Sequence, residues 1–438
     1  MAHEVAFDDV DRFSPARSAA GASRPEERSV AFWGLMMFTF VLLVSPQTLI
    51  PGLGALMPAK IAMAIAIGAY LLSGRRFPVT RTVQWAIAFI GAAIISIPLG
   101  FWPGGSVSTF FNVVAKSLVV FLLIASVVDT PRRLKTLVGW MVACGTVAAV
   151  HAVQHYRTGA LNAAGERIAG YESPLASNPN DLALTMNILL GLALGLLPVV
   201  RRRSRRALLL GAMALLLAGI VASFSRGGFV TLAVVGIVWA VQAMRTRGLR
   251  ALAAVAFVAV VLAIAAPSEY AGRLSTMFDA ETDPTGSAGE RLEVMKTALG
   301  YIAEQPLFGL GLGNSIHVTV LRGGPAREVH NAYLKAGAEL GIPGMVVYTL
   351  FVASAFVTAR TVRRRLARRP DGGELASLAG GIELAVAAFA VGALFSPVPY
   401  HFYFYYPAGL AVALAVMAAR LDATWPSDEP AVPPRDEA

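Results

Sequence analysis

Twelve long apolar runs constrain the fold of this 438-residue chain more than any other feature of its sequence. Each is long enough to cross about 30 Å of hydrocarbon as a helix. Because lipid offers no hydrogen bonds to the backbone, the runs predict an all-α integral membrane protein with about twelve transmembrane helices. The predicted spans are residues 30–48, 52–73, 83–101, 108–128, 134–154, 181–200, 206–224, 228–244, 250–266, 341–360, 377–396 and 402–420.

Composition agrees with this class, since 56% of the residues are hydrophobic and only 15% are charged, which excludes an ordinary soluble domain. The net charge of +10 comes with arginines clustered between the apolar runs. Membrane orientation explains such clusters, so no nucleic-acid partner is expected. The single cysteine, Cys144, lies in an apolar run and excludes an intramolecular disulfide and a cysteine-based metal site.

The loops between the runs predict the orientation of the chain in the membrane. Alternate loops hold twenty Lys and Arg residues, whereas the short loops between them hold only Arg157, Arg167 and Arg226. Because basic residues are retained on the cytoplasmic side, both termini are predicted to be cytoplasmic. The first apolar run is predicted to remain as an uncleaved anchor.

These patterns divide the chain into five parts. Residues 1–29 are a cytoplasmic N-terminal tail, and residues 30–266 form the first nine transmembrane helices. Residues 267–340 are one large periplasmic loop, followed by three more helices in residues 341–420. The proline-rich, acidic residues 421–438 are predicted to be a disordered cytoplasmic tail.

The large loop is predicted to contain short amphipathic helices. In "GERLEVMKTALGYIAEQPLFG", Leu292, Met295, Leu299 and Ile302 recur at helical spacing, so this helix is expected to lie on the membrane or over the bundle. The glycine-rich "GLGLGN" that follows is interpreted as a flexible turn.

The end of the loop, "EVHNAYLKAGAELGIPG", predicts a short helix from about Asn331 that stops at Gly-Ile-Pro-Gly. Its N-terminal N–H groups favour an anion. His330, beside this helix start, is either a helix-end hydrogen-bonding group or a catalytic base. His401, in the aromatic stretch "YHFYFYY", is expected to pack at the membrane interface.

Two arginines have two interpretations each. Arg226 stands in "SFSRGG", a tight outer turn, and is either a snorkelling interfacial arginine or a phosphate ligand. Arg291 opens the amphipathic helix and is either a solvated charge paired with Glu290 or Glu293, or a second ligand.

Three polar residues precede the sixth span in "SPLASNPNDLAL", and Asn178, Asn180 and Asp181 are either helix caps or acceptor-sugar ligands. Lys60 and Lys116 lie inside predicted spans, where a lysine is costly. They are expected either to have a structural partner or to serve carrier-phosphate binding or transport.

Together, "SFSRGG", "GERLEVM" and "HNAYLKAGAELGIPG", in this order, resemble the O-antigen ligase and polymerase superfamily. The resemblance implies an inner-membrane glycosyltransferase with one large periplasmic loop before the tenth crossing. It implies that Arg226 and Arg291 bind the pyrophosphate of an undecaprenyl-pyrophosphate glycan donor. It also implies that His330 serves the acceptor hydroxyl or the leaving phosphate, with Asn331 an acceptor-binding or structural neighbour.

The chemistry of the residues fits this implication. Guanidinium groups neutralise a departing diphosphate, and a histidine takes the proton of the incoming hydroxyl, which gives inversion by single displacement. No cofactor and no metal are expected. The predicted partners are the donor, an acceptor that is the lipid A core or a growing polysaccharide, and membrane lipids. A transporter or flippase is the alternative, and a structural scaffold is a third possibility.

Overall fold

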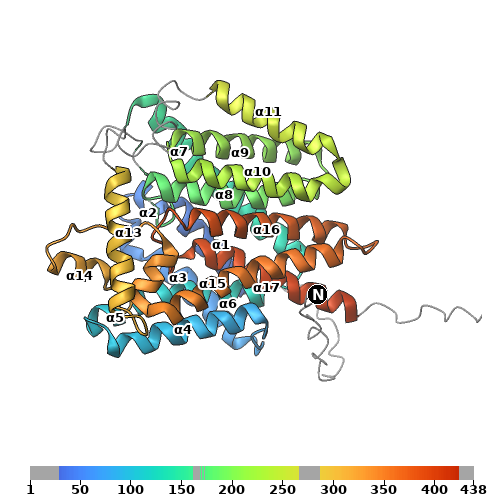
Figure 1. The fold of residues 1–438 in the computed structure, drawn as a ribbon. Helices are drawn as coiled ribbons and strands as arrows, with labels where there is room; N and C mark the ends of the chain where they lie inside the picture. Colours follow the sequence, from blue (N-terminus) through green and yellow to red (C-terminus); the bar gives the residue numbers. More distant parts are fainter. Residues whose placement is uncertain (1–28, 161–167, 169, 172, 266–286, 424–438) are drawn as a thin grey trace, which may run out of the picture.

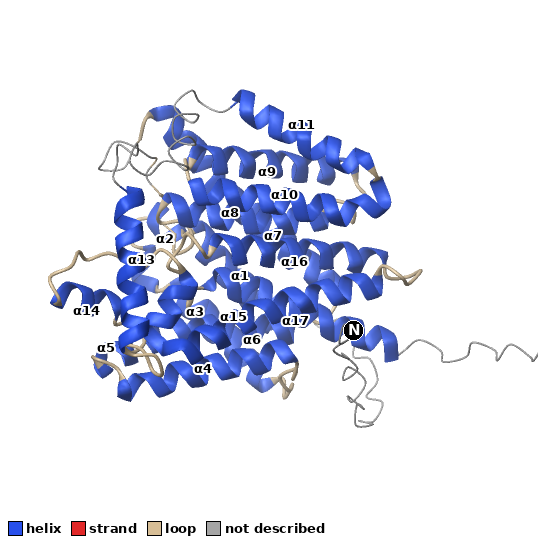
Figure 2. Ribbon diagram, viewed as in Figure 1, coloured by secondary structure: helices blue, strands red, loops and turns tan. Residues whose placement is uncertain are grey.

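The computed structural model describes residues 29–160, 168, 170–171, 173–265 and 287–423. Within these ranges the chain is helical and contains no β-strand (Figures 1 and 2). The two predicted tails, apart from Ser29 and residues 421–423, and the first part of the predicted large loop lie outside the described residues.

The helices follow one another along the chain in this order: α1 (Val30–Val44), α2 (Pro46–Leu49), the 3-10 turn η2 (Leu53–Leu56), α3 (Pro58–Leu72), α4 (Arg81–Leu99), α5 (Pro103–Thr109), the π-helical turn η3 (Phe110–Val114), α6 (Ala115–Val127), α7 (Pro131–Thr158), α8 (Pro179–Leu196), α9 (Arg203–Ala222), α10 (Arg226–Arg247), α11 (Leu249–Ala265), α13 (Ser287–Glu304), α14 (Ser315–Leu321), α15 (Ala332–Leu366), α16 (Gly373–Gly392) and α17 (Phe402–Ala423).

Every predicted span falls on one of these helical segments, which confirms the all-α membrane fold. Ten segments of the described chain are long and apolar enough to cross a membrane. The segments for the first and ninth spans, α1 and α11, are shorter, with 15 and 17 residues. Three of the ten candidate spans, α8, α16 and α17, are buried over most of their length and form the centre of the bundle.

Small residues let the central helices α8 and α16 approach closely. A Cβ atom added to Gly195 of α8 would lie 2.5 Å from the Cα of Gly381 in α16, and one added to Gly191 would lie 2.8 Å from the N of Ala385. Such a pair of small residues four apart on each helix favours tight packing in membranes. The start of α8 is therefore held on a rigid core element.

One end of the bundle gathers the basic loops, and we call it the basic end. Helices α4, α7, α9 and α16 begin there, and α15 and α17 end there. Its exposed charges are joined across loops by ion pairs, namely Arg75–Asp129 at 2.6 Å, Lys135–Glu374 at 2.7 Å and Arg369–Asp422 at 2.7 Å. The loops predicted to share one side of the membrane therefore do meet.

At the opposite end, α13 lies across the ends of the bundle helices (Figure 1). It packs on α15 through Ala298, Tyr301 and Ile302, all buried. The expectation that this helix packs over the bundle is therefore confirmed. Of its four apolar residues at helical spacing, Ile302 is buried in this contact, while Leu292 and Leu299 are exposed.

The turn in "GLGLGN" is anchored by backbone hydrogen bonds, against the prediction of a flexible turn. Its backbone pairs with the middle of α15, since Leu310 N donates to Ala338 O at 2.8 Å and Gly311 N donates to Glu339 O at 2.9 Å. The predicted break in α15 is confirmed at Gly341, whose φ is 74°. Only glycine fits there easily, because an added Cβ would lie 2.5 Å from the backbone of Leu307.

Candidate functional site

Helices α8, α10 and α15 all begin at the end opposite the basic loops, and a polar side chain caps each start. We call this the capped end. On α8, Asn178 Oδ1 accepts from the N–H groups of Asn180 and Asp181 at 3.0 Å. On α10, Ser225 Oγ accepts from Gly228 N at 3.1 Å. On α15, Asn331 Oδ1 accepts from Tyr333 N at 3.0 Å and from Leu334 N at 3.1 Å. Asn178 and Asn331 are thus helix caps, and a further role of either in acceptor binding stays a prediction.

A side-chain bond joins the first two helix starts. Ser225 Oγ donates to Asn180 Oδ1 at 2.8 Å, and Ser225 is only 2% exposed. Asn180 is therefore a link between helices, a role that the sequence did not predict. Because Arg226 is the next residue after Ser225, this bond fixes the point from which its side chain leaves α10.

The start of α15 is tied to the segment between α16 and α17. Ala332 N donates to Ala393 O at 2.8 Å. The same segment reaches α10, because Gly227 packs so closely on the Phe395 side chain that an added Cβ would lie 2.6 Å from it. His330 and Arg226 are thus each within two residues of a contact with this segment.

A buried ion-pair cluster involves residues on both sides of His330 in the sequence. Lys335 is 7% exposed and donates to the carboxylate of Glu328, and its charge also interacts with Glu339 and Asp181. Glu339, 1% exposed, accepts from Gly313 N at 2.9 Å and from the Ser315 hydroxyl at 2.6 Å. A lysine this deeply buried requires such partners.

Asp181 brings α8 into this cluster. The carboxylate is 7% exposed and accepts from the Asn178 amide, and the hydroxyls of Ser396 and Tyr403 lie beside it. The cluster therefore joins α8, α15 and the start of α17. The described residues contain no group of three or more His, Cys, Asp or Glu side chains that could hold a metal ion.

His401 belongs to the same surroundings. Its ring packs near Tyr403, with centroids 6.4 Å apart, but it also faces Lys335 and Glu328. Burial, with a smaller contribution from the positive charge of Lys335, lowers the pKa of His401 to about 4 against the opposing effect of Glu328. The prediction that His401 only packs at the interface missed this polar environment.

The structure ties Arg291 to the capped end less directly than the other predicted site residues. It lies near the start of α13, partly exposed. The residues by which α13 packs on α15 lie about two to three turns further along the helix. The hydrogen bonds that join the three helix starts do not include Arg291.

Lys60 and Lys116 do not lie in the bundle interior. Lys60 is exposed in the first turn of α3, where it donates to Met57 Sδ at 3.3 Å. Lys116 is exposed on α6, directly after the π-helical turn η3. The role of the two lysines stays open between a structural partner and carrier-phosphate binding or transport.

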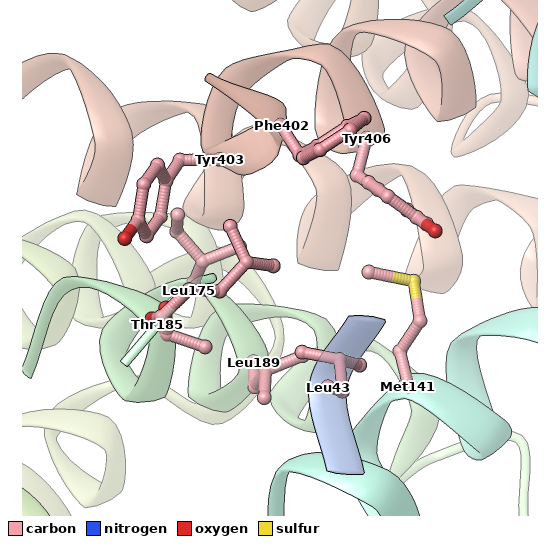
Figure 3. Close-up of a pocket in the computed structure, with 9 residues that line it drawn as sticks. Leu43, Met141, Leu175, Thr185, Leu189, Phe402, Tyr403 and Tyr406 are labelled. Atoms are coloured by element: carbon pink, nitrogen blue, oxygen red, sulfur yellow. The ribbon is translucent and has the colours of Figure 1, made fainter. Parts of the chain in front are cut away.

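A narrow apolar pocket (Figure 3) adjoins the polar cluster through Tyr403, whose hydroxyl lies beside Asp181. Tyr403 and Tyr406 project into it from α17 toward α8, α7 and α1. Its lining residues are Leu43, Met141, Leu175, Thr185, Ile188, Leu189, Phe402, Tyr403 and Tyr406. This apolar lining keeps the effective dielectric low, so the charges beside it interact strongly.

Sequence reasoning overlooked Lys335 and Glu339. Both lie in the "HNAYLKAGAELGIPG" stretch, at i and i+4 in an otherwise apolar helix. Charges in such a position are rare and usually functional. That signal was available, but the interpretation of the stretch rested on its histidine alone.

Residues 211–349 match a family model described as O-antigen ligase. The match covers about a third of the chain and makes this part similar to the O-antigen ligase family. No curated protein matches the chain. The matched residues include Arg226, Arg291, His330 and Lys335, whereas Asn178, Asn180 and Asp181 precede the match. The match supports a membrane enzyme of the O-antigen ligase and polymerase type.

Proposed function

We propose that the capped end transfers a glycan from an undecaprenyl-pyrophosphate carrier to the lipid A core or to a growing polysaccharide. The observation that carries this proposal is the arrangement of three capped helix starts beside His330 and Arg226. Helix N-termini favour anions, and the donor's leaving group is a diphosphate.

In this proposal Arg226 and Arg291 bind the diphosphate. A guanidinium group matches phosphate oxygens bidentately and stays charged. Arg226 is fixed through Ser225 and Asn180, so it is preorganised to neutralise the charge that develops as the donor bond breaks. Arg291 approaches from α13, which lies across the end of the bundle.

His330 takes the proton of the acceptor hydroxyl. The acceptor oxygen forms a bond to the anomeric carbon as the bond from that carbon to the phosphate oxygen breaks. The diphosphate leaves with the electron pair, and the product has inverted configuration. A positioned base of this kind contributes about 10²–10⁴ in rate.

Lys335 acts in this proposal as a positioning residue. By holding Glu328, it folds the residues before α15 back over the helix, and His330 lies within this fold. Glu328 would be the next candidate for the base if His330 were not. Its ion pair with the buried Lys335 argues against that role, because protonation would leave the lysine with one partner fewer.

We propose that the capped end is periplasmic and the basic end cytoplasmic, with both termini cytoplasmic in a bacterial inner membrane. The asymmetry of basic residues supports this orientation. Single cysteines at Gly300 of α13 and at Ser204 of α9, in a Cys144→Ala background, test it. They should label from opposite sides of intact membranes, and labelling of both from one side contradicts the orientation.

The two lysines that suggested a transporter do not support one. Charged residues on a transport path face the bundle interior, but Lys60 and Lys116 are exposed. The test of the function is to incubate purified protein with a lipid-pyrophosphate glycan and separate acceptors. We expect a covalently linked glycan–acceptor product. Movement of the donor lipid across the bilayer without any product would contradict the proposal.

A further inference from the structure

A polar pocket lies at the basic end, between α15 and α17, at the opposite end of the bundle from the starts of α10 and α15. Four arginines, one acid and a threonine provide its polar lining. The lining residues are Thr361, Arg364, Arg365, Arg368, Arg369, Pro370 and Asp422. No part of the proposed transfer chemistry uses this pocket.

Asp422 organises one half of the pocket. Its Oδ2 atom lies 2.7 Å from Arg365 Nη2 and its Oδ1 atom lies 2.7 Å from Arg369 Nη1. Arg369 is also held by Asp371, with Nε and Oδ1 3.0 Å apart. Arg365, whose side chain is 55% exposed, and Arg369 are thus held by carboxylates of the protein, and we call them the inner two arginines.

The outer two arginines differ. Arg364 and Arg368 are exposed, and no ion pair joins either of them to a carboxylate of the described chain. The pocket therefore presents a positive charge that described acidic side chains do not neutralise. Guanidinium groups of this kind match the oxygens of a phosphate.

The outer arginines continue an exposed stripe along α15. Val346, Leu350 and Val357 are 46%, 38% and 57% exposed, and Thr361, Arg364 and Arg368 follow at intervals of three or four residues. Residues at this spacing lie on one face of a helix. Because α15 is a candidate membrane span, its apolar stripe offers a surface for an acyl chain that ends at the arginines.

We propose that this pocket binds the phosphate of an anionic phospholipid, with an acyl chain along the Val346–Val357 stripe. Basic pockets between transmembrane helices on the side of the basic loops are suited to anionic headgroups. The apolar stripe favours a lipid over free phosphate, since only a lipid contacts both surfaces. This site is independent of the proposed glycan transfer, so either proposal can fail alone.

The test measures the binding of phosphatidylglycerol to the full-length protein in detergent by native mass spectrometry, with phosphatidylcholine as the neutral reference. The pocket variant is Arg364→Gln/Arg368→Gln. The matched control is Arg202→Gln/Arg206→Gln, which removes two exposed arginines four residues apart at the same end but outside the pocket. All are checked by size-exclusion chromatography for a monodisperse, folded protein.

Each arginine near an anionic headgroup contributes about fivefold in affinity, or about 1 kcal/mol, so the pocket variant should bind phosphatidylglycerol about 20–30-fold more weakly. The control variant should bind it within about twofold of the natural protein, and binding of phosphatidylcholine should not change. Equal losses in both variants would overturn the proposal, because binding would then follow the total charge and not the pocket.

Two further outcomes would also overturn it. If millimolar inorganic phosphate competed for the pocket as effectively as phosphatidylglycerol does, the pocket would be a site for free phosphate. The acidic residues that follow Asp422 are the other possible occupant. These acidic residues are neutralised in the full chain by Asp428→Asn, Glu429→Gln, Asp436→Asn and Glu437→Gln. Lipid affinity should then be unchanged. A rise in lipid affinity of about tenfold that depends on Arg364 and Arg368 would show that the acidic residues occupy the pocket.

Discussion

The two ends of the bundle use charge in opposite ways. The basic end holds many charged residues, most of them exposed or half-buried and joined in pairs across loops, with one buried carboxylate, Glu383, bound to Arg363. The capped end holds few, but Lys335, Glu339 and Asp181 form one cluster in which each is less than a tenth exposed. The comparison teaches that the number of charges marks orientation, whereas a cluster of several buried charges marks the place where chemistry is expected.

One pair of interactions shows the contrast directly. Arg75 and Lys335 each bind a carboxylate, but the Arg75 side chain is 47% exposed and the Lys335 side chain 9%. Water screens the first pair, so it contributes little to stability. The second lies in a low dielectric, where removing one partner leaves the others buried and uncompensated.

The largest effect that sharpens this comparison is expected at His330. The His330→Ala protein should insert normally and still bind the lipid pyrophosphate, but transfer should fall by about 10²–10⁴ because the general base is lost. Transfer rates and donor binding are measured on the same preparation. His330→Gln keeps hydrogen bonding and loses proton transfer, so a Gln variant with the natural rate would make His330 a structural residue.

The second prediction compares the two ion pairs. Lys335→Met should lower the free energy of unfolding by about 3–5 kcal/mol, because it leaves buried carboxylates unpaired. Arg75→Met should lower it by less than about 1 kcal/mol. Thermal or denaturant unfolding of the purified proteins measures both. Similar losses in the two variants would remove the distinction between the ends.

Lys335→Arg, which keeps the charge, checks the positioning role. If Lys335 positions His330 through Glu328, the Arg variant should be more stable than the Met variant. The residues before α15 should nevertheless not regain their natural position. Transfer should then be slowed with the binding of the donor unchanged. A variant with normal stability and normal transfer would show that the charge alone matters.

The third prediction concerns the arginines at the capped end. Arg226→Lys and Arg291→Lys should each reduce transfer by about 2–4 kcal/mol of transition-state stabilisation, because an ammonium group lacks the bidentate fork. Steady-state transfer kinetics provide the measurement, and Arg202→Lys at the basic end is the control. Near-normal turnover in both capped-end variants would show that these arginines are interfacial snorkelling residues and not phosphate ligands.

The smallest effect is expected in the pH dependence of stability. The pKa of His401 is about 4 in the folded protein, below its ordinary value of 6.5. As the pH falls through this window, the unfolded chain binds a proton that the folded protein does not, so stability is lost. His401→Gln should therefore lose less stability than the natural protein between about pH 7 and about pH 4.5. Thermal unfolding at the two pH values measures this, and an equal loss in both proteins would contradict it.

Much of the fold could be predicted because it follows from local patterns. The length of each apolar run predicted a helix, and the Gly-Ile-Pro-Gly sequence predicted the break found at Gly341. Asn178 and Asn331 precede their helices with the composition of caps, and both are caps. These features depend on neighbours in sequence.

Features that depend on distant residues escaped prediction. The face by which α13 packs depends on Gly337, and the rigidity of the glycine-rich turn depends on the backbone of α15. The bond between Asn180 and Ser225 joins residues 45 positions apart. The surroundings of His401 are polar because α15 places Lys335 near it.

The central claim is that the capped end, and not the arginine-rich end, holds the donor's diphosphate. The most direct measurement is photo-crosslinking of the full-length protein by a lipid-pyrophosphate glycan with a photoreactive group beside the diphosphate, followed by peptide mapping. The account predicts labelled peptides around Arg226 and His330, with labelling lost in excess unlabelled donor. Specific labelling confined to residues 361–370 of the basic end would contradict it.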